Sequence, residues 1–151
     1  MNAKSILIVE DNRQDEMLIL RALKRTGLDC QIEVVRDGQQ AIDYLYCEGE
    51  FGARPKVLPT IVLLDLSLPR VGGLEVLEHL RANNRTKLLP VCVLTSSDEE
   101  CDRWQAYQNG ANSYVRKPLD YPSLVETVSR LAQYWLMLNE PVSVLSKENM
   151  P

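Results

Sequence analysis

Short apolar runs alternate with helical patterns five times along this chain, and this alternation constrains the fold more than any other feature. Successive parallel strands need a long crossover, which is usually a helix, so the alternation favours an α/β protein with a parallel sheet. The expected strands are residues 5–9, 31–35, 61–64, 91–94 and 113–116. The first three expected helices are residues 13–26, 39–47 and 73–83, and residues 48–60 are expected to form a loop.

The last two helices are predicted from their N-terminal caps. Ser97 and Glu100 fit a capping box, in which the serine bonds a backbone amide and the glutamate reaches back. This helix is expected to end near Asn109. Asp120 is expected to cap a final helix that runs through Leu136.

Five βα units predict a doubly wound sheet, because each crossover must be right-handed. We expect the flavodoxin-like (βα)5 architecture with strand order 2-1-3-4-5. The first and third strands are then neighbours, and their carboxyl ends open into one crevice. Ligands of such sheets bind in that crevice. Residues 1–138 are expected to form one domain and residues 139–151 a loose tail.

Composition excludes several classes of function. The net charge is −4, and no run of Lys or Arg predicts binding to nucleic acid or to an anionic membrane. No apolar run reaches the length of a transmembrane helix, and the chain enters its first strand without a signal sequence. We therefore expect a cytoplasmic protein. The four cysteines do not have the spacing of a zinc site.

Polar residues follow the apolar runs at the strand ends. They are Glu10 and Asp11, Asp65, Thr95 and Lys117. Three neighbouring carboxylates repel one another, and a divalent cation relieves that repulsion. Mg²⁺ suits such a site because it binds a few carboxylates and leaves room for phosphate oxygens, although Mn²⁺ or another divalent ion is also an option.

An aspartate nucleophile, a metal, a lysine and a hydroxyl together predict phosphoryl transfer. Taken singly, each residue has an ordinary explanation. Asp11 could belong to a solvated turn, Asp65 to a loop, Thr95 to the core and Lys117 to a surface turn. Their joint placement at the strand ends favours the functional explanation.

The stretches ILIVEDN, IVLLDLSLP, VCVLTSS and YVRKPL occur in the order and spacing of a known family. The chain resembles the receiver domain of bacterial two-component response regulators over residues 4–136. The long loop before the third strand and the apparent lack of an output domain resemble the single-domain regulators that partner bacterial and cyanobacterial phytochromes. The resemblance therefore implies a phosphorelay protein with a histidine kinase as its partner, and the narrower resemblance implies a kinase of the phytochrome type.

The resemblance also implies roles for individual residues. It implies that Asp65 accepts the phosphoryl group, and that Thr95 and Lys117 contact it. Glu10, Asp11 and Asp65 are implied to bind the metal, Asp11 directly and Glu10 through water, together with the backbone carbonyl of Ser67. The Lys117–Pro118 bond is often cis in this family.

Tyr114 matches the switch aromatic of the family, which turns inward when Thr95 moves toward the phosphoryl group. The implied readout face is the fourth helix, fifth strand and fifth helix. Apolar residues 134–138 exceed what one helix face can bury, so we expect some to be exposed. We expect a homodimer through the readout face; the alternative is that the tail covers residues 134–138.

Three other functions are alternatives to a signalling receiver, and the residues present conflict with each of them. A phosphohydrolase of the aspartyl-phosphate type needs an acid/base two residues after the nucleophile, where Ser67 stands. We therefore expect slow self-dephosphorylation only, and no enzymatic turnover of a substrate. A binding module without phosphorylation conflicts with the complete set of acidic residues and Lys117. A cofactor-binding flavodoxin-like domain conflicts with the acidic, glycine-free turn after the first strand.

Overall fold

The computed structural model describes residues 4–142 and contains the five strands and five helices in the predicted order. Residues 143–151 lie outside the described residues, so the predicted tail is seen only from 139 to 142, where it has no helix or strand. The strands are β1 (Ser5–Val9), β2 (Gln31–Val35), β3 (Ile61–Leu64), β4 (Val91–Thr95) and β5 (Ser113–Arg116). The helices are α1 (Arg13–Arg25), α2 (Gly38–Tyr46), α3 (Gly73–Ala82), α4 (Glu100–Gln108) and α5 (Tyr121–Gln133).

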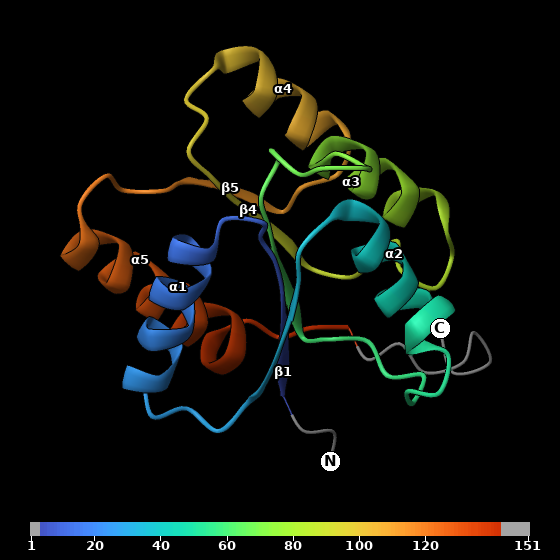
Figure 1. Cartoon of the computed structure of the whole chain (residues 1–151), viewed down its shortest axis with the longest axis horizontal. Coiled ribbons are helices and arrows are strands. Elements are labelled where there is room, and N and C mark those ends of the chain that lie inside the picture. The colour runs from blue at the N-terminus through green and yellow to red at the C-terminus, as the bar shows by residue number, and fades with distance from the viewer. Residues whose placement is uncertain (1–3, 143–151) are drawn as a thin grey trace.

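The sheet is parallel throughout and has the order β2-β1-β3-β4-β5, which confirms the flavodoxin-like prediction (Figure 1). Val9 of β1 pairs with Leu64 of β3, so the residues after these two strands come level with each other. Thr95 pairs with Arg116, the residue before Lys117. The register therefore brings all four strand ends that carry the predicted site to one edge of the sheet.

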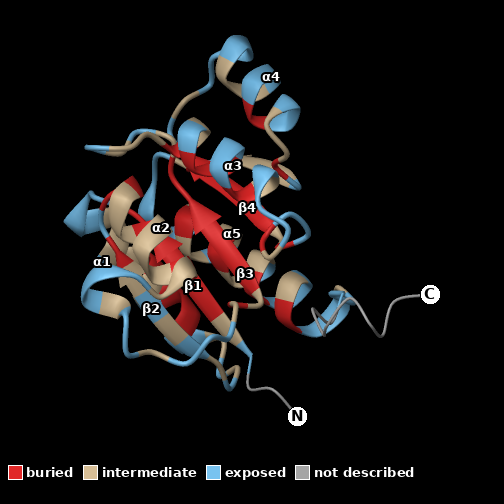
Figure 2. Ribbon diagram, turned by 90° about the vertical axis from the view of Figure 1, so that its right-hand side faces the viewer, coloured by how far each residue is buried: buried red, intermediate tan, exposed pale blue. Residues whose placement is uncertain are grey.

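Two hydrophobic cores cover the two faces of the sheet. Helices α1 and α5 pack on one face, while α2, α3 and α4 pack on the other (Figure 1). Alternate residues of each strand enter opposite cores, as the pleat requires: Leu7 lies in one and Ile8 in the other. The central strands β1, β3 and β4 are buried, whereas the edge strand β2 is partly exposed (Figure 2).

The predicted capping box at Ser97 is wrong. Helix α4 begins at Glu100, and its N-cap residue Glu99 makes no side-chain capping bond. The Ser97 hydroxyl instead accepts from the Glu99 amide at 3.3 Å and donates to Asp102 Oδ2 at 2.6 Å. A serine hydroxyl that accepts from the amide two residues ahead forms a local turn, and α4 therefore begins after this turn.

Two other boundaries differ from prediction. The loop 48–60 contains a short 3-10 helix, Gly49–Phe51. Helix α5 ends at Gln133 and continues as a wider π turn, Tyr134–Leu138, rather than as an α-helix through Leu136. This turn buries Leu136 and leaves Tyr134 and Met137 about half exposed or more, at 49% and 61%. The prediction of exposed apolar residues in this segment is confirmed.

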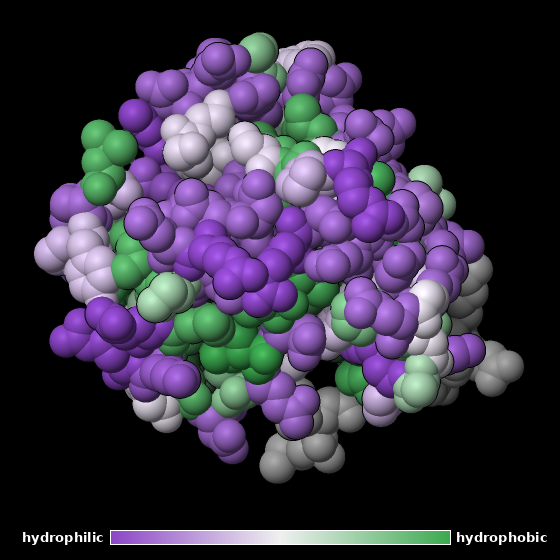
Figure 3. All heavy atoms as spheres, in the orientation of Figure 1, coloured by the Kyte–Doolittle hydropathy of each residue, from purple (hydrophilic) through white to green (hydrophobic). Residues whose placement is uncertain are grey.

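The face seen in Figure 3 is mostly hydrophilic, with hydrophobic side chains gathered in smaller groups. Within residues 4–142, every helix is too short or too polar to span a lipid bilayer.

Candidate functional site

The backbone ladder continues one residue past two central strands and so fixes two acidic side chains. The Glu10 amide donates to the Val35 carbonyl at 3.0 Å, and the Asp65 amide donates to the Val9 carbonyl at 3.1 Å. Glu10 is 1% exposed and Asp65 is 6% exposed. Buried carboxylates at neighbouring strand ends need compensating partners.

Asp65 receives three hydrogen bonds. Lys117 Nζ donates to Oδ2 at 2.8 Å, and the Thr95 hydroxyl donates to Oδ1 at 2.9 Å. The Ser67 amide also donates to Oδ1, at 3.1 Å. A positive charge and a hydroxyl donor therefore converge on the predicted phosphoacceptor.

Lys117 is buried and bridges three carboxylates. Its ammonium lies 2.5 Å from Glu10 Oε1, 2.8 Å from Asp65 Oδ2 and 2.9 Å from Asp15 Oδ2. Asp15 is not among the residues predicted for the site, because an acidic residue in the first turn of a helix already has an ordinary explanation in the helix dipole. The sequence feature that could have pointed to Asp15 is its position four residues after Asp11.

Burial and neighbouring charges shift the pKa values of the three buried groups in this cluster in different directions. Burial raises the pKa of Glu10 to about 7, because the hydrogen bond from Lys117 offsets desolvation only in part and the charge of Asp65 adds to it. Burial also acts to raise the pKa of Asp65, but Lys117 and the Ser67 amide outweigh it and hold that pKa below its usual value. Burial opposes the charge on Lys117, yet Asp65 and Glu10 raise its pKa above the ordinary range. Asp65 is therefore an ionised carboxylate, as a nucleophile must be.

The acidic residues have the composition of a divalent-cation site. Glu10, Asp11 and Asp65 each offer a carboxylate oxygen, and these oxygens lie within 4.8 Å of one another. Asp11 is exposed, whereas the other two are buried, so the trio faces solvent on one side. Hard oxygen ligands with an open side fit Mg²⁺ or Mn²⁺.

Helix α3 packs directly against the backbone of Asp65. A Cβ added to Gly73 would lie 2.4 Å from the Asp65 carbonyl oxygen, so only glycine fits at this position. On the other side of the same loop, a Cβ added to Gly38 would lie 1.9 Å from the Val71 carbonyl oxygen. Two close backbone contacts therefore hold the β3–α3 loop, which carries Ser67.

A family comparison identifies this arrangement. The model of the response regulator receiver domain matches residues 6–129. The chain belongs to the response regulator receiver family. Receiver domains are phospho-accepting signalling proteins that interact with histidine kinases and bind a divalent metal at their acidic pocket.

Three relatives illustrate where this receiver lies within the family. It is 47% identical to the probable methanogenesis regulatory protein FilR2 of Methanothrix harundinacea, over 89% of this chain and 84% of that protein. It is 36% identical to the response regulator Rcp1 of Synechocystis, over 88% and 89% of the two chains. The Mn²⁺-bound form of Rcp1 superposes with a TM-score of 0.87 at 34% identity, over 93% of this chain and 99% of that one.

The third relative is the phosphorylated cyanobacterial phytochrome response regulator RcpA. It superposes with a TM-score of 0.88 at 34% identity and covers 94% of this chain and 100% of that one. The resemblance to phytochrome response regulators noted from the sequence is thus confirmed.

Tyr114, which the sequence predicts to be the switch aromatic, is partly buried beside α4. Its hydroxyl donates to the Ser97 carbonyl at 3.0 Å, and the Arg103 guanidinium lies 5.7 Å from the centre of its ring. The Lys117–Pro118 bond is trans, as are all peptide bonds of the described residues, so the family's frequent cis bond does not occur here. The Lys117 ammonium is held instead by its carboxylate partners.

Proposed function

We propose that this receiver accepts a phosphoryl group on Asp65 from a histidine kinase in a Mg²⁺-dependent reaction. The observation that carries the proposal is the pair of hydrogen bonds that the Lys117 ammonium and the Thr95 hydroxyl donate to the ionised Asp65 carboxylate. Donors beside the nucleophile would stabilise the negative charge of phosphoryl oxygens, which supports the proposal.

In the proposed reaction, an Asp65 carboxylate oxygen forms a bond to phosphorus while the bond from phosphorus to the kinase histidine nitrogen breaks. The bonding electron pair stays on the imidazole nitrogen, which leaves. Lys117 and Thr95 bind the transferred oxygens and orient them. Glu10, Asp11, Asp65 and the Ser67 carbonyl would hold the Mg²⁺ ion, which neutralises negative charge on the phosphoryl group.

Loss of the phosphoryl group is proposed to be slow self-dephosphorylation. Ser67 stands two residues after Asp65, and its hydroxyl cannot act as a general acid or base near neutral pH. This position distinguishes the receiver from phosphohydrolases of the aspartyl-phosphate type. The protein is therefore proposed to store a signal rather than to turn over a substrate.

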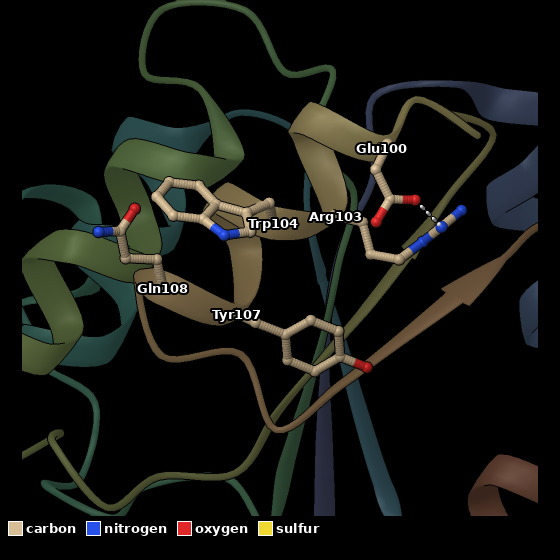
Figure 4. Close-up of a pocket in the computed structure, with 5 residues that line it drawn as sticks. All are labelled: Glu100, Arg103, Trp104, Tyr107 and Gln108. Carbon is tan, nitrogen blue, oxygen red and sulfur yellow. Dashed lines mark hydrogen bonds and ion pairs between the residues drawn. The ribbon is translucent and has the colours of Figure 1, made fainter.

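The signal is proposed to leave through the face formed by α4, β5 and α5. Thr95 and Tyr114 form the switch, since Thr95 contacts Asp65 and Tyr114 contacts the loop before α4. On α4, Trp104 and Tyr107 project from the helix and are 63% and 50% exposed (Figure 4). Exposed aromatic side chains of this kind favour a protein contact, and we propose a homodimer through this face.

A phytochrome-type histidine kinase is the proposed partner. Support comes from the similarity to Rcp1 and RcpA and from 46% identity to the bacteriophytochrome response regulator RtBRR. Phosphotransfer from such a kinase, compared with an unrelated histidine kinase, tests the pairing. Equal transfer from both kinases would contradict it.

Acetyl phosphate and Mg²⁺ test the core of the proposal. Intact mass should rise by one phosphoryl group in the wild type and stay unchanged in Asp65→Asn, while EDTA should prevent the gain. A wild type that stays unmodified, or a variant that is modified equally, would contradict the assignment of Asp65.

Sedimentation at micromolar concentration tests the proposed dimer, which Trp104→Ala should weaken. A strict monomer with and without phosphodonor would refute the dimer.

A further inference from the structure

Asp15 contacts the site but does not belong to the metal-binding trio. It occupies the first turn of α1, where its amide donates to the capping side chain of Asn12 at 3.0 Å. This cap fixes the start of the helix, and the Asp15 carboxylate reaches back across the crevice to Lys117 Nζ at 2.9 Å. Its side chain is 29% exposed, so solvent screens this contact only in part.

The contact completes the hydrogen bonding of the Lys117 ammonium. An ammonium has three N–H donors and no acceptor. Glu10, Asp15 and Asp65 supply one oxygen each, so every donor of Lys117 has a carboxylate partner. Three partners from three separate elements restrict the position of the ammonium more than any one of them could.

The three partners differ in what happens to them during the proposed reaction. Asp65 and Glu10 are members of the metal-binding trio, and an oxygen of Asp65 also becomes bonded to phosphorus. Both residues must therefore redistribute their contacts when the metal and the phosphoryl group arrive. Asp15 is not required by either ligand, so its contact with Lys117 can persist throughout.

From this asymmetry we infer that Asp15 is a positioning residue, which anchors the Lys117 ammonium over Asp65 before and during phosphoryl transfer. The inference rests on the proposed phosphorylation of Asp65 and deepens it. Asp15 touches neither the metal nor the phosphoryl group in this scheme, and it acts only through Lys117. Removal of its charge should slow the reaction without preventing it.

The adjacent residue Glu16 provides a matched control. It lies in the same helical turn, carries the same charge and also makes an ion pair, to Arg36 at 3.0 Å. Glu16→Gln therefore reproduces the loss of one negative charge at the helix N-terminus, and the loss of one ion pair, without affecting Lys117. An effect specific to Asp15→Asn cannot be assigned to the helix dipole.

The test compares Asp15→Asn, Glu16→Gln and wild type in two measurements. The first is the rate of mass gain with acetyl phosphate and Mg²⁺. We expect Asp15→Asn to be about threefold to tenfold slower, the change that one net hydrogen bond corresponds to, and Glu16→Gln to stay within about twofold of wild type.

The second measurement is urea unfolding in EDTA, with Asp15→Asn made in the wild type and in Lys117→Met. We expect the substitution to destabilise the wild type and to cause no loss in the Lys117→Met background, because its partner is absent there. Equal losses in both backgrounds, or equal rates for Asp15→Asn and Glu16→Gln, would overturn the inference. Absence of phosphorylation in the wild type would instead refute the proposed function itself.

Discussion

Replacement of Lys117 by methionine tests how the acidic cluster is held together without metal. Methionine fills much of the volume of the lysine stem, so the substitution mainly removes the charge. The lost ammonium contacts Glu10, Asp65 and Asp15 at 2.5, 2.8 and 2.9 Å, and the first two carboxylates are nearly inaccessible to solvent. Removal of one partner from a buried ion pair typically costs about 3–5 kcal/mol.

Protonation of Glu10 should moderate this loss. Its pKa is already raised to about 7, with Lys117 opposing the rise, so the pKa of Glu10 climbs further in the variant. At about pH 6 a proton then replaces part of the missing charge, whereas at about pH 8 less of Glu10 is protonated. We expect a loss of about 3 kcal/mol or more at the higher pH and a smaller loss at the lower pH.

Urea unfolding followed by far-UV circular dichroism, in EDTA and at both pH values, measures these losses. Lys56→Met is the control, since Lys56 is exposed and makes no ion pair among residues 4–142. It should change the free energy of unfolding by less than about 0.5 kcal/mol. Saturating Mg²⁺ should shrink the loss in Lys117→Met. A loss below about 1 kcal/mol in EDTA at about pH 8, or one independent of pH, would refute the reasoning.

Three further predictions concern the same site. In EDTA, protonation of Glu10 contributes stability that is complete below the unfolded pKa of 4.5 and is lost as pH rises through the folded pKa of about 7. The urea midpoint of the wild type should therefore fall between about pH 5 and 8, and Mg²⁺ should reduce that fall. Gly73→Ala should lower the free energy of unfolding by about 1–3 kcal/mol and slow phosphorylation. Gly72→Ala should do neither, because a Cβ at Gly72 would meet nothing closer than 4.0 Å. Equal effects of the two substitutions would contradict the close contact at Gly73. Thr95→Val removes the 2.9 Å bond to Asp65 and should lower the free energy of unfolding by about 1 kcal/mol, as urea titration would show.

The local pattern of the sequence was sufficient to predict the sheet and the main site. Apolar runs such as Ile61–Leu64 are buried on both faces, as continuous hydrophobic strands of a parallel sheet must be. Once the strand order is known, residues at the carboxyl ends of β1, β3, β4 and β5 must meet at one edge of the sheet. Glu10, Asp65, Thr95 and Lys117 were therefore predictable as a group.

Two helix boundaries differ from the predicted pattern. Ser97 fits a capping box by sequence, yet its hydroxyl bonds Asp102 and the Glu99 amide, and α4 starts later. The end of α5 widens into a π turn that buries Leu136 against the α1 and α5 core. A local turn therefore decides the start of α4, whereas tertiary packing prevails over a weak helical preference at the end of α5.

The sequence by itself determined the order of strands and helices and the chemistry available at the strand ends, because these follow from periodicity and from residues a few positions apart. Only the tertiary structure decided that Asp15 joins Lys117, 102 positions away, and that Gly73 must lack a side chain beside Asp65. Such contacts depend on how helices are set against the sheet to within a fraction of an ångström. That setting results from close packing of the whole core and cannot be read from any one segment.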